Sequence, residues 1–274
     1  MTATRTAGSL ALAFSTPMGR SSPTKSKALL IVNADDWGSD VATTDAIGEC
    51  FEAGAVTSIS AMVFMADSER AAGLAVERAL PVGLHINLTE GFSAEALDGA
   101  VRSRQARLVR YFAGPKWRMW GFSPRLFAQI ESAIADQLTE FRRLYGREPS
   151  HFDGHHHVHQ SLSVLFARTL PRGAKMRPSF TFRSGEKSVA NRAVRGLLNR
   201  TMLARFATPR YFFAIEDIHP QLGGAGLEER LARAGGSTVE VMTHPGDEQE
   251  RSILLSPAWR ELIATRRVGG YADL

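Results

Sequence analysis

Carboxylate and imidazole side chains gather at four points of this sequence, at or near the ends of apolar runs. Side chains of these two types bind divalent cations and transfer protons near neutral pH. The four points therefore predict a metal-assisted catalytic site. They are Asp35 and Asp36 after the run 28–32, His85 within the run 82–88, the segment 151–159, and His244 after the run 238–242.

The adjacent carboxylates Asp35 and Asp36 directly follow a short, β-branched apolar run that is typical of a buried parallel strand. Adjacent aspartates in a loop are commonly just solvated. If both point into a site, one can bind a cation while the other accepts a proton from water.

The segment 151–159 holds five histidines and Asp153 within nine positions. Fully extended, its alternate residues would share one face, but Gly154 favours a bend, so not all of them can reach one ion. A surface histidine tract is the alternative, although this segment lies mid-chain between two predicted helices. Two imidazoles and one carboxylate suit zinc or another first-row metal and leave positions open for water and substrate.

Three further residues have two interpretations each. His85 lies inside a predicted strand, where a lone histidine is commonly a hydrogen-bonded core residue, and only its partners would make it a ligand. His244 precedes a Pro-Gly turn and is otherwise a candidate proton donor. Arg177, near the end of a predicted strand at 174–177, would hold an anionic or hydroxyl-rich group, or form a surface salt bridge.

Alternation of strands and helices along the chain predicts a parallel sheet of the α/β class, in one domain over 29–274. The carboxyl ends of such strands face one mouth, where distant residues converge. Residues 90–122 are predicted to be an irregular inserted loop, and 183–235 give little pattern. The predicted strands are 28–32, 58–64, 82–88, 174–177, 211–215 and 238–242, and the predicted helices lie near 41–53, 67–79, 124–145, 161–169 and 227–234.

Composition excludes several classes of protein. The 274 residues carry a net charge of +5, but residues 1–28 hold four basic side chains and no acid, so 29 basic against 28 acidic residues remain. We therefore expect no nucleic-acid partner, and 1–28 is predicted to be a disordered leader rather than a secretory signal. No run is long enough to span a membrane.

The single cysteine, Cys50, excludes an intrachain disulfide, and a reducing, cytoplasmic location is expected. The oligomeric state is left open, a homodimer included.

Four motifs together resemble those of the YdjC/ChbG family of carbohydrate deacetylases, which includes the HpnK-like proteins. Trp37 stands where that family usually has phenylalanine. The order and spacing of the motifs cover about residues 28–250. The motifs are Ile31-Val32-Asn33-Ala34-Asp35-Asp36-Trp37-Gly38, Gly83-Leu84-His85-Ile86-Asn87-Leu88-Thr89, 151–159, and Met242-Thr243-His244-Pro245-Gly246.

The resemblance implies a distorted (β/α) barrel with one divalent metal ion, magnesium or zinc, held by Asp36, His85 and His155. It also implies Asp35 as general base and His244 as general acid in hydrolysis of an N-acetylated sugar.

Asp153 is expected to orient a ligand imidazole from behind. The alternatives are a metal-dependent phosphoesterase, which would need a second metal, and a catalytically silent carbohydrate- or metal-binding protein.

Overall fold

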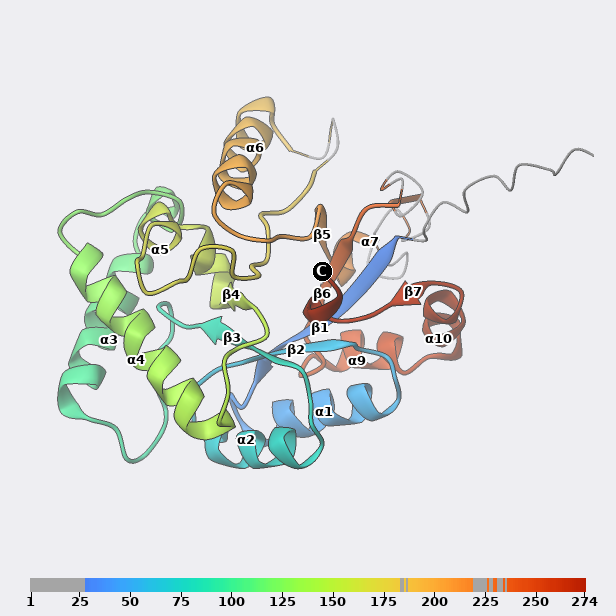
Figure 1. Ribbon diagram of the computed structural model, residues 1–274, viewed down its shortest axis with the longest axis horizontal. Coiled ribbons are helices and arrows are strands. Elements are labelled where there is room, and N and C mark those ends of the chain that lie inside the picture. The colour runs from blue at the N-terminus through green and yellow to red at the C-terminus, as the bar shows by residue number, and fades with distance from the viewer. Residues whose placement is uncertain are drawn as a thin grey trace, which may run out of the picture.

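Parallel strands form the centre of the protein in the computed structural model, which describes residues 28–182, 185, 187–218, 226, 229–230, 234 and 236–274 (Figure 1). The strand order is β4-β3-β2-β1-β6-β5, and β7 also pairs with β1. Most strands are short apolar runs buried on both faces, as parallel strands covered by helices must be. The strands are β1 (Leu29–Trp37), β2 (Ser58–Ala61), β3 (Val82–Ile86), β4 (Phe152–Gly154), β5 (Tyr211–Ala214), β6 (Val239–Thr243) and β7 (Arg267–Val268).

Parallel pairing continues beyond β4 through two isolated bridges, Phe152 with Met176 and Lys175 with Ala207. The predicted strand at 174–177 is thus reduced to two bridged residues. These bridges extend the curl of the sheet into a half-barrel. The expected α/β fold class is confirmed, with a half-barrel in place of a closed barrel.

Helices cover the outside of the sheet (Figure 1). Asp40 caps the first helix by accepting a hydrogen bond from the Thr43 amide, a role that aspartate commonly has at this position. The longest helix ends at Gly146, whose φ of 65° gives the left-handed cap that glycine adopts readily. The helices are α1 (Val41–Glu52), α2 (Ser68–Glu77), α3 (Gly99–Phe112), α4 (Phe127–Tyr145), α5 (Leu162–Leu165), α6 (Val189–Leu203), α7 (Ile215–Ile218), α9 (Glu248–Leu254) and α10 (Pro257–Ala264), with 3-10 turns η1 (Lys116–Met119), η2 (His155–Gln160) and η4 (Tyr271–Asp273).

Several predicted boundaries were wrong. The supposedly irregular segment 90–122 contains the helix α3 and the turn η1. The helix α4 begins at Phe127 rather than at Ser123-Pro124, because those residues form a turn that the Leu126 amide closes by donating to the Ser123 carbonyl. The helix predicted at 161–169 has only four residues, in α5.

The segment 183–235 is better ordered than its pattern indicated, where the structure describes it. It holds the fifteen-residue helix α6 and the predicted strand at 211–215, seen as β5. The helix predicted at 227–234 falls largely outside the described residues, as does the leader, so the division at residue 28 stays a prediction. Among the described residues, no helix has the length and apolar character needed to cross a membrane.

Candidate metal centre and catalytic site

A bulge at the carboxyl end of β1 turns two neighbouring carboxylates toward the same cavity. The register between β1 and β2 shifts between Ala34 and Trp37, and Asp36 has a φ of 71°, which non-glycine residues seldom adopt. In a regular strand Asp35 and Asp36 would point to opposite faces. Because of the bulge, both line one cavity while Trp37 returns to the core with no exposed surface.

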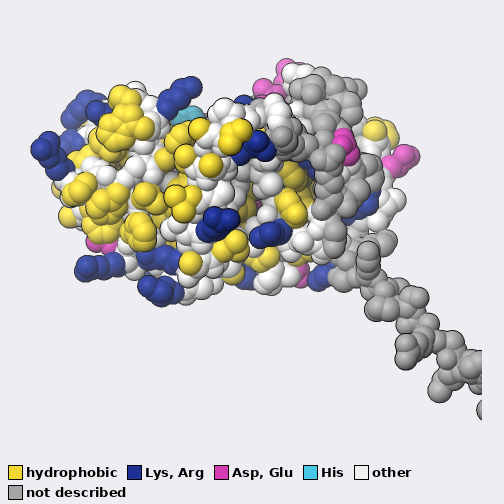
Figure 2. Space-filling view, turned by 90° about the horizontal axis from the view of Figure 1, so that it is seen from above, with side chains coloured by type: hydrophobic (Ala, Val, Ile, Leu, Met, Phe, Trp, Pro, Cys, Tyr) yellow, Lys and Arg dark blue, Asp and Glu magenta, His cyan; other side chains and the backbone are white. Residues whose placement is uncertain are grey.

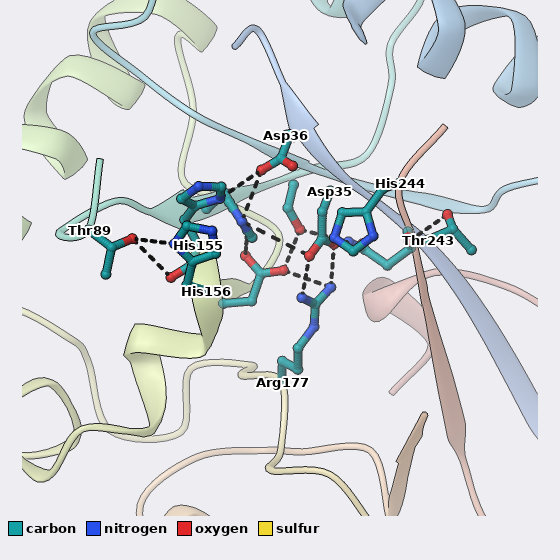
Figure 3. A network of polar contacts seen from close by, with 12 residues as sticks. Asp35, Asp36, Thr89, His155, His156, Arg177, Thr243 and His244 are labelled. Carbon is teal, nitrogen blue, oxygen red and sulfur yellow. Dashed lines mark hydrogen bonds and ion pairs between the residues drawn. The ribbon is translucent and has the colours of Figure 1, made fainter. Parts of the chain in front are cut away.

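Asp36, His85 and His155 come together at this point, from β1, β3 and the turn η2. Figure 3 shows Asp36 and His155 of this group. One ligand atom of each lies within 4.8 Å of the others. The Asp36 Oδ1 atom is 3.3 Å from His85 Nε2 and 3.1 Å from His155 Nδ1. Burial opposes ionisation of Asp36, but hydrogen bonds to the two imidazoles outweigh it and hold the pKa of Asp36 well below its ordinary value.

Asp153 lies behind His85 and fixes the orientation of its ring. Asp153 Oδ1 is 2.8 Å from His85 Nδ1, which leaves Nε2 directed at Asp36. The Ser60 hydroxyl donates to the other oxygen of Asp153 at 2.6 Å. Burial lowers the pKa of His85, but the charges of Asp153 and Asp35 raise it further, so the net pKa lies well above its ordinary value. A carboxylate behind an imidazole is the usual support of a metal-ligating histidine.

Arg177 is fully buried and contacts three carboxylates. Its Nη1 and Nη2 atoms each lie 2.6 Å from an oxygen of Asp35, in the paired geometry that guanidinium and carboxylate form. Nη2 is also 2.9 Å from Asp153, and Nε is 2.8 Å from Glu240. Of the two interpretations of Arg177, the surface salt bridge is therefore excluded, because the side chain is fully buried and holds internal carboxylates in place behind the cavity.

Glu240, the second residue of β6, is the third carboxylate that contacts Arg177. Its second oxygen accepts a hydrogen bond from the Tyr271 hydroxyl. Burial raises the pKa of Glu240 to about 7, against the opposing charge of Arg177. One guanidinium cannot neutralise three buried carboxylates, so it is favourable for one of them to keep a proton.

His244 follows β6 and lines the same cavity as Asp35 and Asp36. In Figure 3 its ring lies beside Asp35. The carboxylate of Glu250 accepts a hydrogen bond from the His244 backbone amide and lies 3.5 Å from ring atom Nδ1. Partial burial lowers the pKa of His244, but Glu250 and the aspartates outweigh it and raise the pKa to about 9.

The histidine segment bends after Gly154, as expected, so its five imidazoles separate. Only His155 joins Asp36 and His85. His151 packs away from the cavity, stacked on Tyr271 with ring centroids 3.8 Å apart, and burial lowers its pKa to about 4. The turn η2 has left-handed φ values at its second and third residues, 50° and 60°.

Sequence reasoning missed Glu90 and Glu240. Glu90 directly follows Thr89, the last residue of the second motif, and its Oε2 atom is 3.1 Å from His155 Nε2. Its position in the sequence, a carboxylate two residues after the predicted strand 82–88, could have indicated it. Glu240 could have been noticed as a lone acid inside an apolar run, because a charged side chain buried in a strand needs a partner.

The cavity beside these residues has a volume of about 650 Å³ and is walled partly by Phe180 and Phe182. A second cavity of about 470 Å³ adjoins it and shares His156, His157 and Arg195. The second is more apolar, with Phe112, Met119 and Trp120 in its wall.

The donor set of Asp36, His85 and His155 fits a divalent cation. It combines two imidazoles with one carboxylate at the edge of an open cavity, as catalytic metal sites do. A second group, Asp35, His85 and Asp153, is equally compact. Both of its aspartates are already paired with Arg177, so it is the weaker candidate.

Fold and site together define an α/β half-barrel with a candidate metal centre at the carboxyl edge of its strands. The model of the family described as YdjC-like protein matches residues 29–265, so the chain belongs to that family. It is 31% identical to the chitooligosaccharide deacetylase of Enterobacter sp. (strain 638) over 90% of this chain and 99% of the relative. It is 39% identical to the carbohydrate deacetylase of Mus musculus over 52% of this chain and 46% of the relative.

A solved structure supports the fold independently. The crystal structure of a "putative cellobiose-phosphate cleavage protein" from Enterococcus faecalis V583 superposes with a TM-score of 0.65 at 20% sequence identity. The superposition covers 90% of this chain and 99% of that one. At this identity the likeness concerns the arrangement of strands and helices.

Proposed function

We propose that this protein is a metal-dependent hydrolase that removes the N-acetyl group from an amino sugar. The observation behind the proposal is the convergence of Asp36, His85 and His155 beside Asp35 and His244, in one open cavity. The names of the relatives, which describe deacetylases of carbohydrates, supply the substrate class.

Asp36, His85 and His155 would hold the metal. When bound, a divalent cation supplies Lewis-acid polarisation of the acetyl carbonyl and makes water more acidic. The supporting Asp153 keeps His85 Nε2 turned toward that position. Its buried hydrogen bond to Ser60 fixes the carboxylate in turn.

Asp35 is the proposed general base. Arg177 holds both of its oxygens and Asn33 donates to Oδ1 at 2.9 Å, so the carboxylate cannot rotate. Each carboxylate oxygen has two lone pairs, and one on Oδ2 stays free to accept a proton from the attacking water. Oδ2 lies 4.0 Å from His85 Nε2, next to the ligand group.

His244 is the proposed general acid. The amine of the sugar is a poor leaving group unless its nitrogen gains a proton. Glu250 raises the pKa of His244 to about 9, so the imidazolium is present at neutral pH to donate that proton. The aromatic rings of Phe180 and Phe182 provide apolar faces on which a sugar ring can pack.

Substitutions separate metal binding from turnover. Asp36→Ala and His155→Ala should lose both bound metal and acetate release. Metal analysis measures the first, and an assay on a panel of N-acetylated sugars, with metal added back after chelation, measures the second.

Asp35→Asn should keep the metal and lose turnover by roughly 100-fold or more. The control is His156→Ala, an exposed neighbour outside the ligand group, which should keep the metal. Full activity in metal-stripped Asp35→Asn protein would refute the proposal.

Metal stoichiometry tests the phosphoesterase alternative. Two-metal phosphoester chemistry needs a second bound cation, and here the second acidic group is paired with Arg177. We expect one metal per chain. A silent binding protein would instead bind sugar without releasing acetate.

The cytoplasm is the proposed location. Cys50 is buried and unpaired, and burial raises the pKa of its thiol to about 11. An inert, reduced thiol is compatible with a reducing compartment.

A further inference from the structure

Two segments of the chain concentrate positive charge without any acid. Residues 99–130 contain seven lysines and arginines, and residues 187–215 contain six, yet neither segment has an aspartate or glutamate. Beyond residue 28 the chain as a whole is nearly neutral, with 29 basic and 28 acidic residues. The excess charge is therefore a local property of these two segments.

The two segments form the two sides of one opening. Lys116 and Trp120, in and just after η1, line the apolar cavity together with Arg195 of α6. The Arg195 guanidinium lies 5.7 Å from the centre of the Trp120 ring. This cavity shares His156 with the cavity of the metal centre, so the opening leads toward the site.

Large apolar side chains are exposed on both sides of the opening. On α6, Val189 is 74% exposed and Leu197 is 64% exposed, and Trp117 in η1 is 61% exposed. In Figure 2 hydrophobic and basic side chains intermix on this face, with few acidic ones on its left half. The rim surface is the set of exposed apolar side chains and neighbouring basic side chains on the two segments. It consists of Lys116, Trp117, Arg118, Phe122, Val189, Arg192, Val194, Leu197, Arg200 and Leu203.

We propose that the rim surface docks onto an anionic lipid membrane. A helix that shows apolar residues to solvent and carries only basic charges is typical of peripheral binding at a headgroup layer. Lysines and arginines are attracted to anionic lipids, and the exposed Leu197 and Trp117 can enter the acyl boundary. A nucleic acid would explain the charge but leave these apolar side chains without a partner. A second copy of this chain would place arginine against arginine.

Docking in this way turns the opening toward the membrane. The apolar cavity then faces lipid, and the metal centre lies behind it through the shared wall at His156 and His157. The proposal concerns where the protein acts and does not depend on which bond it hydrolyses.

Vesicle flotation of the full chain tests the proposal. The wild type should float with vesicles of equimolar phosphatidylglycerol and phosphatidylcholine, remain unbound with phosphatidylcholine alone, and bind less as NaCl is raised. Leu197→Glu and Trp117→Glu should each weaken binding about tenfold or more, because a charge replaces an inserted apolar side chain. The matched control is Val76→Glu on α2, where the valine is 55% exposed but lies outside the rim surface.

Residues 1–28, with their four basic side chains, are present in every variant, so a difference between variants reports on the rim surface. Circular dichroism confirms that each variant folds. The proposal is overturned if the wild type does not float with anionic vesicles, or if Val76→Glu weakens binding as much as Leu197→Glu. It is also overturned if Leu197→Glu and Trp117→Glu bind as the wild type does, or if sedimentation shows a dimer that Leu197→Glu dissociates.

Discussion

At the scale of single residues, the buried charges behind the site balance only if one acid is neutral. Arg177 faces Asp35, Asp153 and Glu240, all buried. A pKa of about 7 lets Glu240 keep its proton in neutral or acidic solution, and the raised pKa of His85 adds a second cation before metal binds. Two carboxylates then face two cations. Metal binding must displace the proton of His85, so metal affinity should fall as the solution becomes more acidic.

His244 sets an expected alkaline limit to activity. Its pKa of about 9 means that the donor form is present below that pH and is lost as pH rises through it. The protonated ring also stabilises the folded state. This contribution to the free energy of unfolding is complete below pH 6.5, the ordinary pKa of histidine, and is lost as pH rises toward 9. Glu250→Gln keeps the oxygen that accepts from the His244 amide but removes the charge, so the alkaline limb of the kcat profile should move down by roughly one pH unit or more.

Glu248→Gln is the control for that pH profile. Glu248 lies on the same helix, α9, but its side chain is exposed, and the carboxylate at His244 is that of Glu250. The alkaline limb of the kcat profile of Glu248→Gln should match that of the wild type. An unmoved limb in Glu250→Gln would show that His244 is not the group that limits activity at high pH.

At the scale of elements, burial decided which segments were predictable from sequence. The core strands are mostly apolar and buried on both faces, so β3 and β6 lie within two residues of their predicted bounds. The strand β1 begins close to its predicted start but continues to Trp37, five residues beyond the predicted end, because the apolar pattern stops before its polar carboxyl end. The helix α3 was missed because four arginines interrupt its pattern and few of its side chains are buried. The helix α6 was missed for a related reason, because much of its apolar surface faces solvent and gives no single buried stripe.

Close packing between β3 and the residue before β4 gives a prediction about stability. A Cβ built on Gly83 would lie 2.3 Å from the His151 ring, which is held by Tyr271 and Ser60 and cannot move aside. Gly83→Ala should therefore lower the free energy of unfolding by about 1–3 kcal/mol in urea titration. Gly73→Ala, in α2, meets nothing within 4 Å and should raise it by roughly 0.5–1 kcal/mol. Equal effects of the two would mean that His151 is not fixed.

At the scale of the whole molecule, the candidate ligands could be predicted because topology alone brings them together. The carboxyl ends of parallel strands share one edge, so Asp36, His85 and His155 converge although 119 positions separate the first from the last. Topology does not determine which partners a long side chain reaches on other elements. The three carboxylates around Arg177 and the contact of Glu90 with His155 depend on such side chains, so the sequence pattern does not predict them.

A metal at this position would join β1, β3 and the turn after β4, so its binding should stabilise the whole domain. The ligand atoms converge only in the folded chain, and a cation that binds the native state alone raises the free energy of unfolding by about 2.7 kcal/mol at 100 times its Kd. For a chain of this size that corresponds to a rise in Tm of roughly 5–10 °C. Thermal unfolding with zinc, with magnesium and with chelator measures the shift without reference to activity. Asp36→Ala should abolish it and His156→Ala should keep it, because only Asp36 belongs to the ligand group. An equal shift in both variants would place the cation elsewhere.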